Sequence, residues 1–194
     1  MEDNVQEQAE IQQPGHNPQA GSLIQSCFEW LEALIAAIVI VVVLLTFFFR
    51  TVNVSGPSME NTLQDQDRVL LTSWGYTPEP GDIVVITRAA HLEEPLVKRV
   101  IAVEGQTLHI DYDTGNVYVD GVLLNEPYIK NATTTPGDWE IPSVIPEGYV
   151  FVMGDNRQIS KDSRYEEVGL IDERNILGKV QFIFYPFDRI GGLY

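Results

Sequence analysis

The chain has 194 residues with 28 acidic and 12 basic side chains, a formal net charge of −16, and this length suits one domain with an appendage. The acidic excess argues against a nucleic-acid-binding protein, because neutralising phosphates needs clustered Lys and Arg. Three His and one Cys exclude a zinc finger, a Cys-rich iron–sulfur protein and a disulfide-stapled scaffold.

The N-terminal segment has little apolar surface to bury. Residues 1–22 are rich in Gln, Asn, Pro, Gly and Glu, and all 12 Lys and Arg lie after residue 49. Such a segment cannot offset its ordering entropy, so we predict a disordered tail over residues 1–26.

An apolar run follows the tail. Residues 33–49 contain 17 residues without a charge, and as a helix they would reach roughly 26 Å. A cleaved signal peptide typically has a basic segment before its apolar run and a cleavage site of small residues after it. Neither feature is present here. A buried core helix is the other alternative, but the run shows no polar face. We therefore predict one transmembrane helix over residues 27–50.

Residues 51–194 are predicted to form a mainly β, antiparallel domain. Short apolar runs alternate with Gly, Pro, Asp and Asn, and no βα alternation is present. Residues 104–148 are expected to be a variable excursion within this domain. The predicted strands are Thr51–Ser55, Arg68–Ser73, Asp82–Arg88, Leu96–Val103, Thr107–Tyr112, Asn116–Val119, Tyr149–Met153 and Gly178–Phe184.

A tight turn directly after the first predicted strand presents a candidate nucleophile. Gly56 and Pro57 constrain the backbone that carries Ser58. A serine can act as a nucleophile only with a base beside it. A plain turn with a solvent-facing Ser58 is the alternative interpretation.

Lys98 is the best candidate for that base, because none of the three His is suitably placed. Alternation puts Lys98 and Arg99 on opposite faces of an apolar strand, so one of them points toward apolar neighbours. Apolar surroundings lower the pKa of a lysine, and a neutral amine can take the proton from Ser58. A solvated Lys–Arg pair on a strand edge is the alternative.

The third notable stretch, the Gly154 segment (residues 154–164), is dense in paired charges and hydroxyls. Its alternating Asp and Arg could form a rigid network of charge-assisted hydrogen bonds. A metal site is disfavoured, because Arg157 and Arg164 would repel a cation and no His is near. We expect neither a metal nor a cofactor.

Taken together, these stretches resemble the bacterial type I signal peptidases, membrane-bound Ser-Lys proteases of the serine peptidase family that contains leader peptidase, here of Gram-positive-like type. The resemblance runs from about residue 30 to the C-terminus. It rests on four boxes in the family's order: the nucleophile box at 55–63, a strand box at 81–85, the lysine box at 98–100, and the box usually written GDNRxxSxDSR at 154–164.

The resemblance implies roles for individual residues. Ser58 would be the nucleophile, Lys98 the general base, and Ser160 the hydroxyl that orients the lysine amine. The Ser58 N–H would donate to the oxyanion, and Gly56 stands where some members supply a second donor. The charged residues expected to brace the site as structural supports are Asp155, Arg157, Asp162 and Arg164.

The activity implied is removal of N-terminal signal peptides from exported preproteins through an acyl-enzyme. The substrate should bind as an added strand beside Val54 and Val97, with Val54, Met59 and Val97 lining its pockets. Small side chains would suit the first and third positions before the cut.

The resemblance also implies a place and partners: a single-pass protein of the cell membrane, with the tail in the cytoplasm and the β domain on the extracytoplasmic side. Its partners would be preprotein signal peptides, membrane lipid and the neighbouring secretion translocon, with no nucleic acid. Arg50 alone would favour the opposite orientation, because basic residues flank the cytoplasmic end of a span.

Two stretches depart from the family pattern. Asn61 stands where the family usually has Pro, and Ala102, Glu104 and Gln106 stand where its lysine box usually continues with Gly, Pro and Asp. Both differences concern the geometry of turns.

Two rival functions are also considered. A self-cleaving Ser-Lys protease of the repressor type is disfavoured by the apolar run and the lack of a basic DNA-binding region. An inactive, membrane-tethered module that holds export substrates is disfavoured by the joint presence of Ser58, Lys98 and Ser160.

Overall fold

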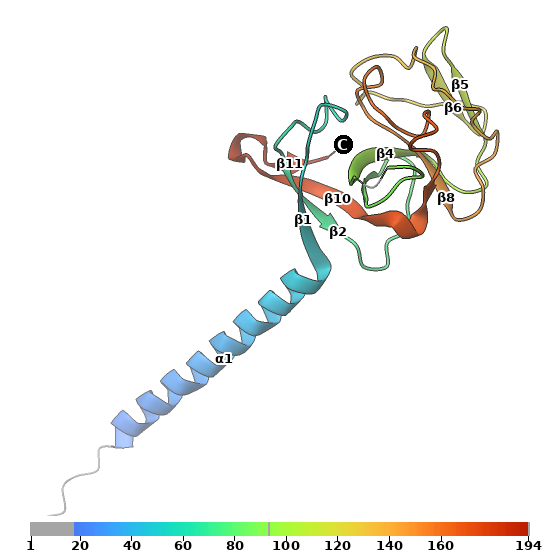
Figure 1. Ribbon diagram of the computed structural model, residues 1–194. Coiled ribbons are helices and arrows are strands. Elements are labelled where there is room, and N and C mark those ends of the chain that lie inside the picture. The colour runs from blue at the N-terminus through green and yellow to red at the C-terminus, as the bar shows by residue number, and fades with distance from the viewer. Residues whose placement is uncertain (1–17, 93, 194) are drawn as a thin grey trace, which may run out of the picture. The chain divides into compact units, whose positions relative to one another are not determined.

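The computed structural model describes residues 18–92 and 94–193, which form one long helix followed by β strands (Figure 1). The chain divides into two compact units, Met1–Val43 and Leu44–Tyr194, each described by itself. The second is called the β unit below. Residues 1–17 of the predicted tail lie outside the described residues.

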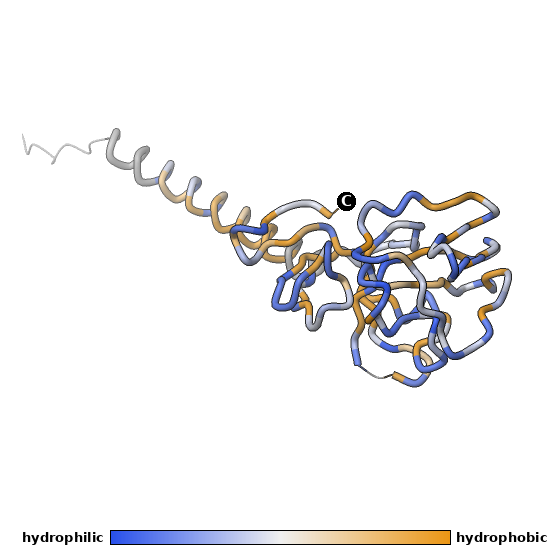
Figure 2. The backbone as a smooth tube through the Cα atoms, turned by 90° about the horizontal axis from the view of Figure 1, so that it is seen from above, coloured by the Kyte–Doolittle hydropathy of each residue, from blue (hydrophilic) through white to orange (hydrophobic). Residues whose placement is uncertain are grey.

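The helix α1 spans Pro18–Phe48. The predicted tail is therefore helical over residues 18–26, and residues 49–50 of the predicted span belong to the first strand. Pro18 is compatible with this early start, because the first turn of a helix leaves its N–H groups unbonded and needs no donor there. Within α1, Gln25–Val43 is long and apolar enough to cross a membrane by length and composition, and none of it is buried. Figure 2 shows this part of the helix as mainly hydrophobic.

The β unit confirms the predicted antiparallel, mainly β fold. Its larger sheet has the order β1-β2-β10-β3-β4-β8-β9, with β11 paired to β10, and a smaller sheet has the order β5-β6-β7. The strands are β1 (Phe49–Asn53), β2 (Arg68–Thr72), β3 (Ile83–Ile86), β4 (Leu96–Ala102), β5 (Leu108–Asp111), β6 (Asn116–Val119), β7 (Val122–Leu123), β8 (Tyr149–Met153), β9 (Ile171–Asp172), β10 (Ile176–Tyr185) and β11 (Gly191–Gly192). Two 3-10 turns, Glu173–Asn175 and Phe187–Arg189, flank β10.

All eight predicted strands are present: β6 and β8 have the predicted ends, and the ends of the other six are shifted by one or two residues. Three strands of two residues each, β7, β9 and β11, were not predicted, because two residues are too short to show an alternating pattern. The predicted excursion at 104–148 contains the whole of the smaller sheet.

Two features of the core fix the region around Ser58. Val54 and Met59, which precede and follow Ser58, are 3% and 1% exposed and belong to one apolar cluster with β2, β3 and β10. Residues 55–62 are called the Ser58 turn below. Strand β4 lies between β3 and β8, so its residues from Lys98 onward are buried. The burial of these neighbours leaves the Ser58 turn and β4 little freedom to move.

Candidate active site

The Ser58 turn leaves the serine partly exposed on a constrained backbone. Gly56 has φ of 83°, which favours glycine, and the chain then forms a helical turn in which the Glu60 N–H donates to Pro57 O at 3.2 Å. Within residues 18–92 and 94–193, nothing accepts a hydrogen bond from the Ser58 N–H. This donor is therefore free to bind an oxygen of a ligand.

Strand β4 brings Lys98 to Ser58. Lys98 Nζ lies 2.9 Å from Ser58 Oγ and donates to the Val97 carbonyl at 3.0 Å. The antiparallel register pairs Lys98 with Val84 of β3, and the Lys98 side chain is 3% exposed. The lysine is thus the member of the Lys98–Arg99 pair that reaches the serine.

Burial changes the acid–base chemistry of this lysine. Desolvation lowers the pKa of Lys98 from 10.5 to about 8, although the nearby carboxylates of Asp162 and Asp155 act in the opposite direction. At pH 7 about one amine in ten is then neutral, compared with about one in three thousand for an ordinary lysine. A neutral amine at hydrogen-bonding distance can accept the proton of a hydroxyl.

The Gly154 segment supports the Ser58 turn through backbone contacts. The Asn156 N–H donates to Ser58 O at 3.0 Å, and Asn156 Nδ2 donates to Pro57 O at 3.2 Å. A Cβ on Gly154 would lie 2.4 Å from Ser58 O and 2.2 Å from Ser160 Oγ. Only glycine permits this close approach of the two chain segments.

No hydrogen bond joins the Ser160 hydroxyl to Lys98 within the described residues. The serine Oγ is buried and has no hydrogen-bond partner in the part of the chain that the structure describes. Lys98 Nζ donates to the Val97 carbonyl instead. The Ser160 hydroxyl lies close to Gly154, since a Cβ on that glycine would be 2.2 Å from Ser160 Oγ.

Gly56 does not supply a second oxyanion donor either. Its N–H donates to Asp65 Oδ1 at 2.9 Å, and glycine has no side chain to offer. The role that the structure gives Gly56 is conformational, because its positive φ allows the turn.

Asp155 forms its ion pair with a residue outside the Gly154 segment. Arg99 Nε and Nη2 donate to its two carboxylate oxygens at 2.8 and 2.7 Å, and both side chains are almost fully buried. The Thr62 hydroxyl donates to the same carboxylate. The Arg99 guanidinium also lies 3.9 Å from the centre of the Tyr128 ring. Strand β4 therefore carries Lys98 and the partner of Asp155 at neighbouring positions.

The other three predicted supports form two further buried pairs. Arg164 holds both oxygens of Asp162 at 2.8 and 2.9 Å, and Asp162 accepts from the Gly154 N–H at 3.1 Å. Arg157 pairs with Glu126 at 2.5 Å and donates to Thr133 Oγ1 at 2.6 Å. The structure also places no group of three or more His, Cys, Asp or Glu side chains for metal binding within residues 18–92 and 94–193.

Several site residues escape prediction from the sequence. They are Arg99, Thr62, Asn156, Glu126, Tyr128 and Thr133. The first three lie inside or beside recognised boxes, where their charge or polarity is a usable signal. The last three lie in the excursion, whose sequence has no periodicity to mark them.

A small cavity of about 110 Å³ adjoins Ser58 and Lys98. It lies between the end of β1 and the beginning of β4, and the three predicted pocket residues Val54, Met59 and Val97 all line it. Its full lining is Val52, Asn53, Val54, Ser55, Ser58, Met59, Val85, Pro95, Leu96, Val97 and Lys98.

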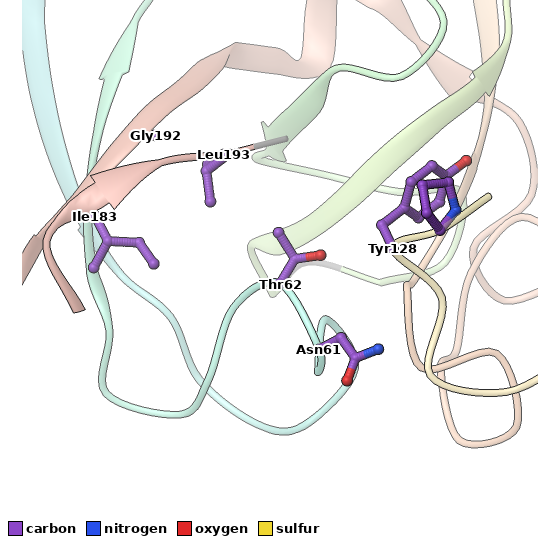
Figure 3. Close-up of a pocket in the computed structure, with 7 residues that line it drawn as sticks. Asn61, Thr62, Tyr128, Ile183, Gly192 and Leu193 are labelled. Carbon is purple, nitrogen blue, oxygen red and sulfur yellow. The ribbon is translucent and has the colours of Figure 1, made fainter. Parts of the chain in front are cut away.

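A larger cavity of about 410 Å³ lies elsewhere on the β unit (Figure 3). Its labelled side chains are Ile183 and Leu193 on one side, Tyr128 on the other, and Asn61 and Thr62 below. Neither Ser58 nor Lys98 lines the larger cavity, whereas both line the smaller one.

Comparison with known proteins gives a family match and close relatives. The family described as "Signal peptidase, peptidase S26" matches residues 27–185. Signal peptidase I of Bacillus licheniformis is 38% identical over 176 residues, which cover 85% of this chain and 92% of that protein. Signal peptidase IB of Staphylococcus aureus is 37% identical over 179 residues, covering 83% and 91%. A solved signal peptidase I from Enterococcus faecalis has a TM-score of 0.42 and 23% identity, covering 54% of this chain and 97% of that one.

Proposed function

The chain belongs to the signal peptidase family, peptidase S26, and we propose that it cleaves signal peptides with Ser58 as the nucleophile and Lys98 as the general base. The observation that carries this proposal is the 2.9 Å separation of Lys98 Nζ and Ser58 Oγ, with the lysine buried. A serine and a base at that distance are the minimum that nucleophilic catalysis requires.

Acylation begins with neutral Lys98. Its amine takes the proton of Ser58 Oγ while the oxygen attacks the carbonyl carbon of the scissile bond. The negative charge that develops on the carbonyl oxygen is bound by the free Ser58 N–H, and one such donor contributes about 3–4 kcal/mol to transition-state stabilisation. The Lys98 ammonium then gives its proton to the leaving amine, which releases the mature protein.

Deacylation repeats these proton transfers with water. The signal peptide is held as an ester on Ser58 Oγ. Lys98, neutral again, removes a proton from a water molecule that attacks the ester carbonyl. The same proton then returns to Ser58 Oγ as the ester bond breaks, and the signal peptide leaves as a carboxylic acid that releases its own proton to water.

The substrate binds in extended form between two free strand edges. Strand β1 ends the described sheet order, and β8 pairs with β4 only from Arg99 onward. The backbone on either side of the small cavity is therefore available to pair with an extended peptide. The cavity of about 110 Å³ has the volume of about four water molecules, so it accepts only small side chains before the cut.

The apolar helix α1 anchors the protein in the cell membrane. Nine residues separate its end at Phe48 from Ser58, and this short connection tethers the reactive serine to the lipid surface. The orientation that we propose places the tail in the cytoplasm and the β unit outside it, next to the secretion translocon, where signal peptides of preproteins emerge. The match of the family to residues 27–185, most of α1 included, supports an anchored enzyme.

The test uses an exported preprotein with an Ala-x-Ala site, added to the full-length protein in detergent. Wild type should yield the mature protein with a new N-terminus after the second Ala, and Lys98→Met should yield none while retaining its fold. Substantial cleavage by Lys98→Met would refute the dyad. Binding without cleavage by wild type would indicate an inactive module, and cleavage of only its own chain would indicate a self-processing protease.

A further inference from the structure

The Ser58 turn has no proline after the serine. Two of its polar side chains instead bond to residues of the excursion. Asn61 Nδ2 donates to the Ile129 carbonyl at 3.1 Å, and Glu60 Oε2 accepts from Lys130 Nζ at 2.7 Å. Lys130 lies 70 residues later in the chain than Glu60. The excursion therefore reaches back to the turn that carries Ser58 (Figure 3).

The same stretch of the excursion is also tied to the Gly154 segment. The Lys130 N–H donates to Asp155 O at 2.9 Å. Asn156 Nδ2 lies 3.3 Å from Glu60 Oε2, and the Asn156 N–H donates to Ser58 O at 3.0 Å. The contacts thus form a closed ring from the Ser58 turn to the excursion, to the Gly154 segment, and back to Ser58.

These contacts contribute little to the stability of the fold. The side chains of Lys130 and Glu60 are 46% and 34% exposed, and exposed ion pairs contribute about 0–1 kcal/mol. Neither residue lines the small cavity where the substrate would bind. Removing the contacts should therefore change neither the unfolding temperature nor substrate affinity by much.

We propose that Glu60, Asn61 and Lys130 form a clamp of positioning residues that holds Ser58 Oγ in line with Lys98 Nζ during the reaction. The proposal rests on the proposed role of Ser58 as the nucleophile. None of the three clamp residues touches the reacting atoms, so each acts through the backbone of the turn. A misplacement of about 1 Å in a reacting group can cost roughly a hundredfold in rate.

The main test is a double-mutant cycle on full-length protein in detergent, with kcat, KM and unfolding temperature measured for each variant. Glu60→Gln and Lys130→Met should each lower kcat about five- to tenfold with unchanged KM, and the double variant should lose no more than either single one. The charge-swapped variant, Glu60→Lys with Lys130→Glu, should recover most of kcat.

The matched control breaks another exposed ion pair outside the clamp. Arg174 pairs with Asp172 at 2.5 Å with its side chain 88% exposed, and Arg174→Met should leave kcat unchanged. A second test of the clamp replaces Asn61. Asn61→Ala should lower kcat, whereas Asn61→Pro should restore it, because proline stiffens the turn and the Asn61 N–H makes no hydrogen bond within residues 18–92 and 94–193.

Three results would overturn the clamp: single variants within twofold of wild-type kcat, multiplicative losses in the double variant, or losses that appear in KM alone. If a single variant also lowers the unfolding temperature, the charge-swapped variant distinguishes a loss of positioning from a loss of stability. Failure of that variant to recover kcat would count against the clamp. Ser58→Ala is measured alongside. Its retained activity would refute the proposed function, whereas the cycle reports on the clamp alone.

Discussion

The rate of signal-peptide cleavage is expected to depend on the protonation of Lys98. Below pH 8, kcat/KM should rise about tenfold for each pH unit, and it should level off above a pH of about 8. The reason is that the mechanism needs the neutral amine, whose fraction grows tenfold per unit until pH reaches the pKa of Lys98.

The size of the effect follows from the burial of the side chain. Desolvation lowers the pKa of Lys98 from 10.5 to about 8, against the opposing effect of Asp162 and Asp155. At pH 7 this shift increases the neutral fraction about 300-fold over that of an exposed lysine. An exposed lysine would instead give a rate that still climbs steeply at pH 9.

The assay is the initial rate of cleavage of one preprotein at pH 5.5 to 9.5, with substrate below KM so that the profile reports the free enzyme. Circular dichroism at each pH serves as the control for folding. A profile that is flat between about pH 6 and 9, or one that rises without a plateau to pH 9.5, would contradict a base with this pKa.

Three changes in stability are expected, each measured by urea unfolding. Lys98→Met should be more stable than wild type at pH 7. The difference in the free energy of unfolding should shrink by about 3 kcal/mol between pH 7 and 10.5. The reason is that the pKa of Lys98 is about 8 in the folded chain and 10.5 ordinarily, so the unfolded chain binds more protons than the folded one in that range. Asp155→Ala should cost about 3–5 kcal/mol, because it leaves Arg99 buried without its carboxylate. Ser160→Ala should stabilise by about 1–2 kcal/mol, because it removes a buried hydroxyl that has no partner.

Each of these three stability predictions has an outcome that would contradict it. A Lys98→Met gap that is independent of pH would mean that the lysine is not desolvated in the folded protein. A loss below about 1 kcal/mol for Asp155→Ala would mean that water reaches Arg99. A destabilised Ser160→Ala protein would mean that the hydroxyl has a partner in solution.

The strands and the proximity of Lys98 to Ser58 are the parts of the molecule that sequence patterns predict well. Alternation over five or more residues identifies strands such as β4, and an apolar strand that contains Lys98 suggests a buried lysine. The start of α1 at Pro18 is less predictable, because residues 18–26 are polar and carry no periodic signal. The resemblance of four boxes to a known family supplies the remaining site assignments.

Long-range contacts are what the sequence cannot supply. Arg157 pairs with Glu126, 31 residues away, and the Asp155 carboxylate pairs with Arg99, 56 residues away. Nothing local distinguishes Glu126 from any exposed glutamate, because its burial depends on how the excursion folds over the Gly154 segment. The role of the Ser160 hydroxyl stays a prediction from the family pattern, because the hydroxyl is buried beside Gly154 without a hydrogen-bond partner among the described residues.

The most direct test of the account is the cleavage rate of Ser58→Ala with the full-length protein and one exported preprotein. The substitution removes the single oxygen that lies 2.9 Å from Lys98 Nζ and leaves the backbone donor in place. Ser58→Ala should lose at least about a thousandfold in kcat with an unchanged unfolding temperature. A Ser58→Ala rate within tenfold of wild type would contradict it.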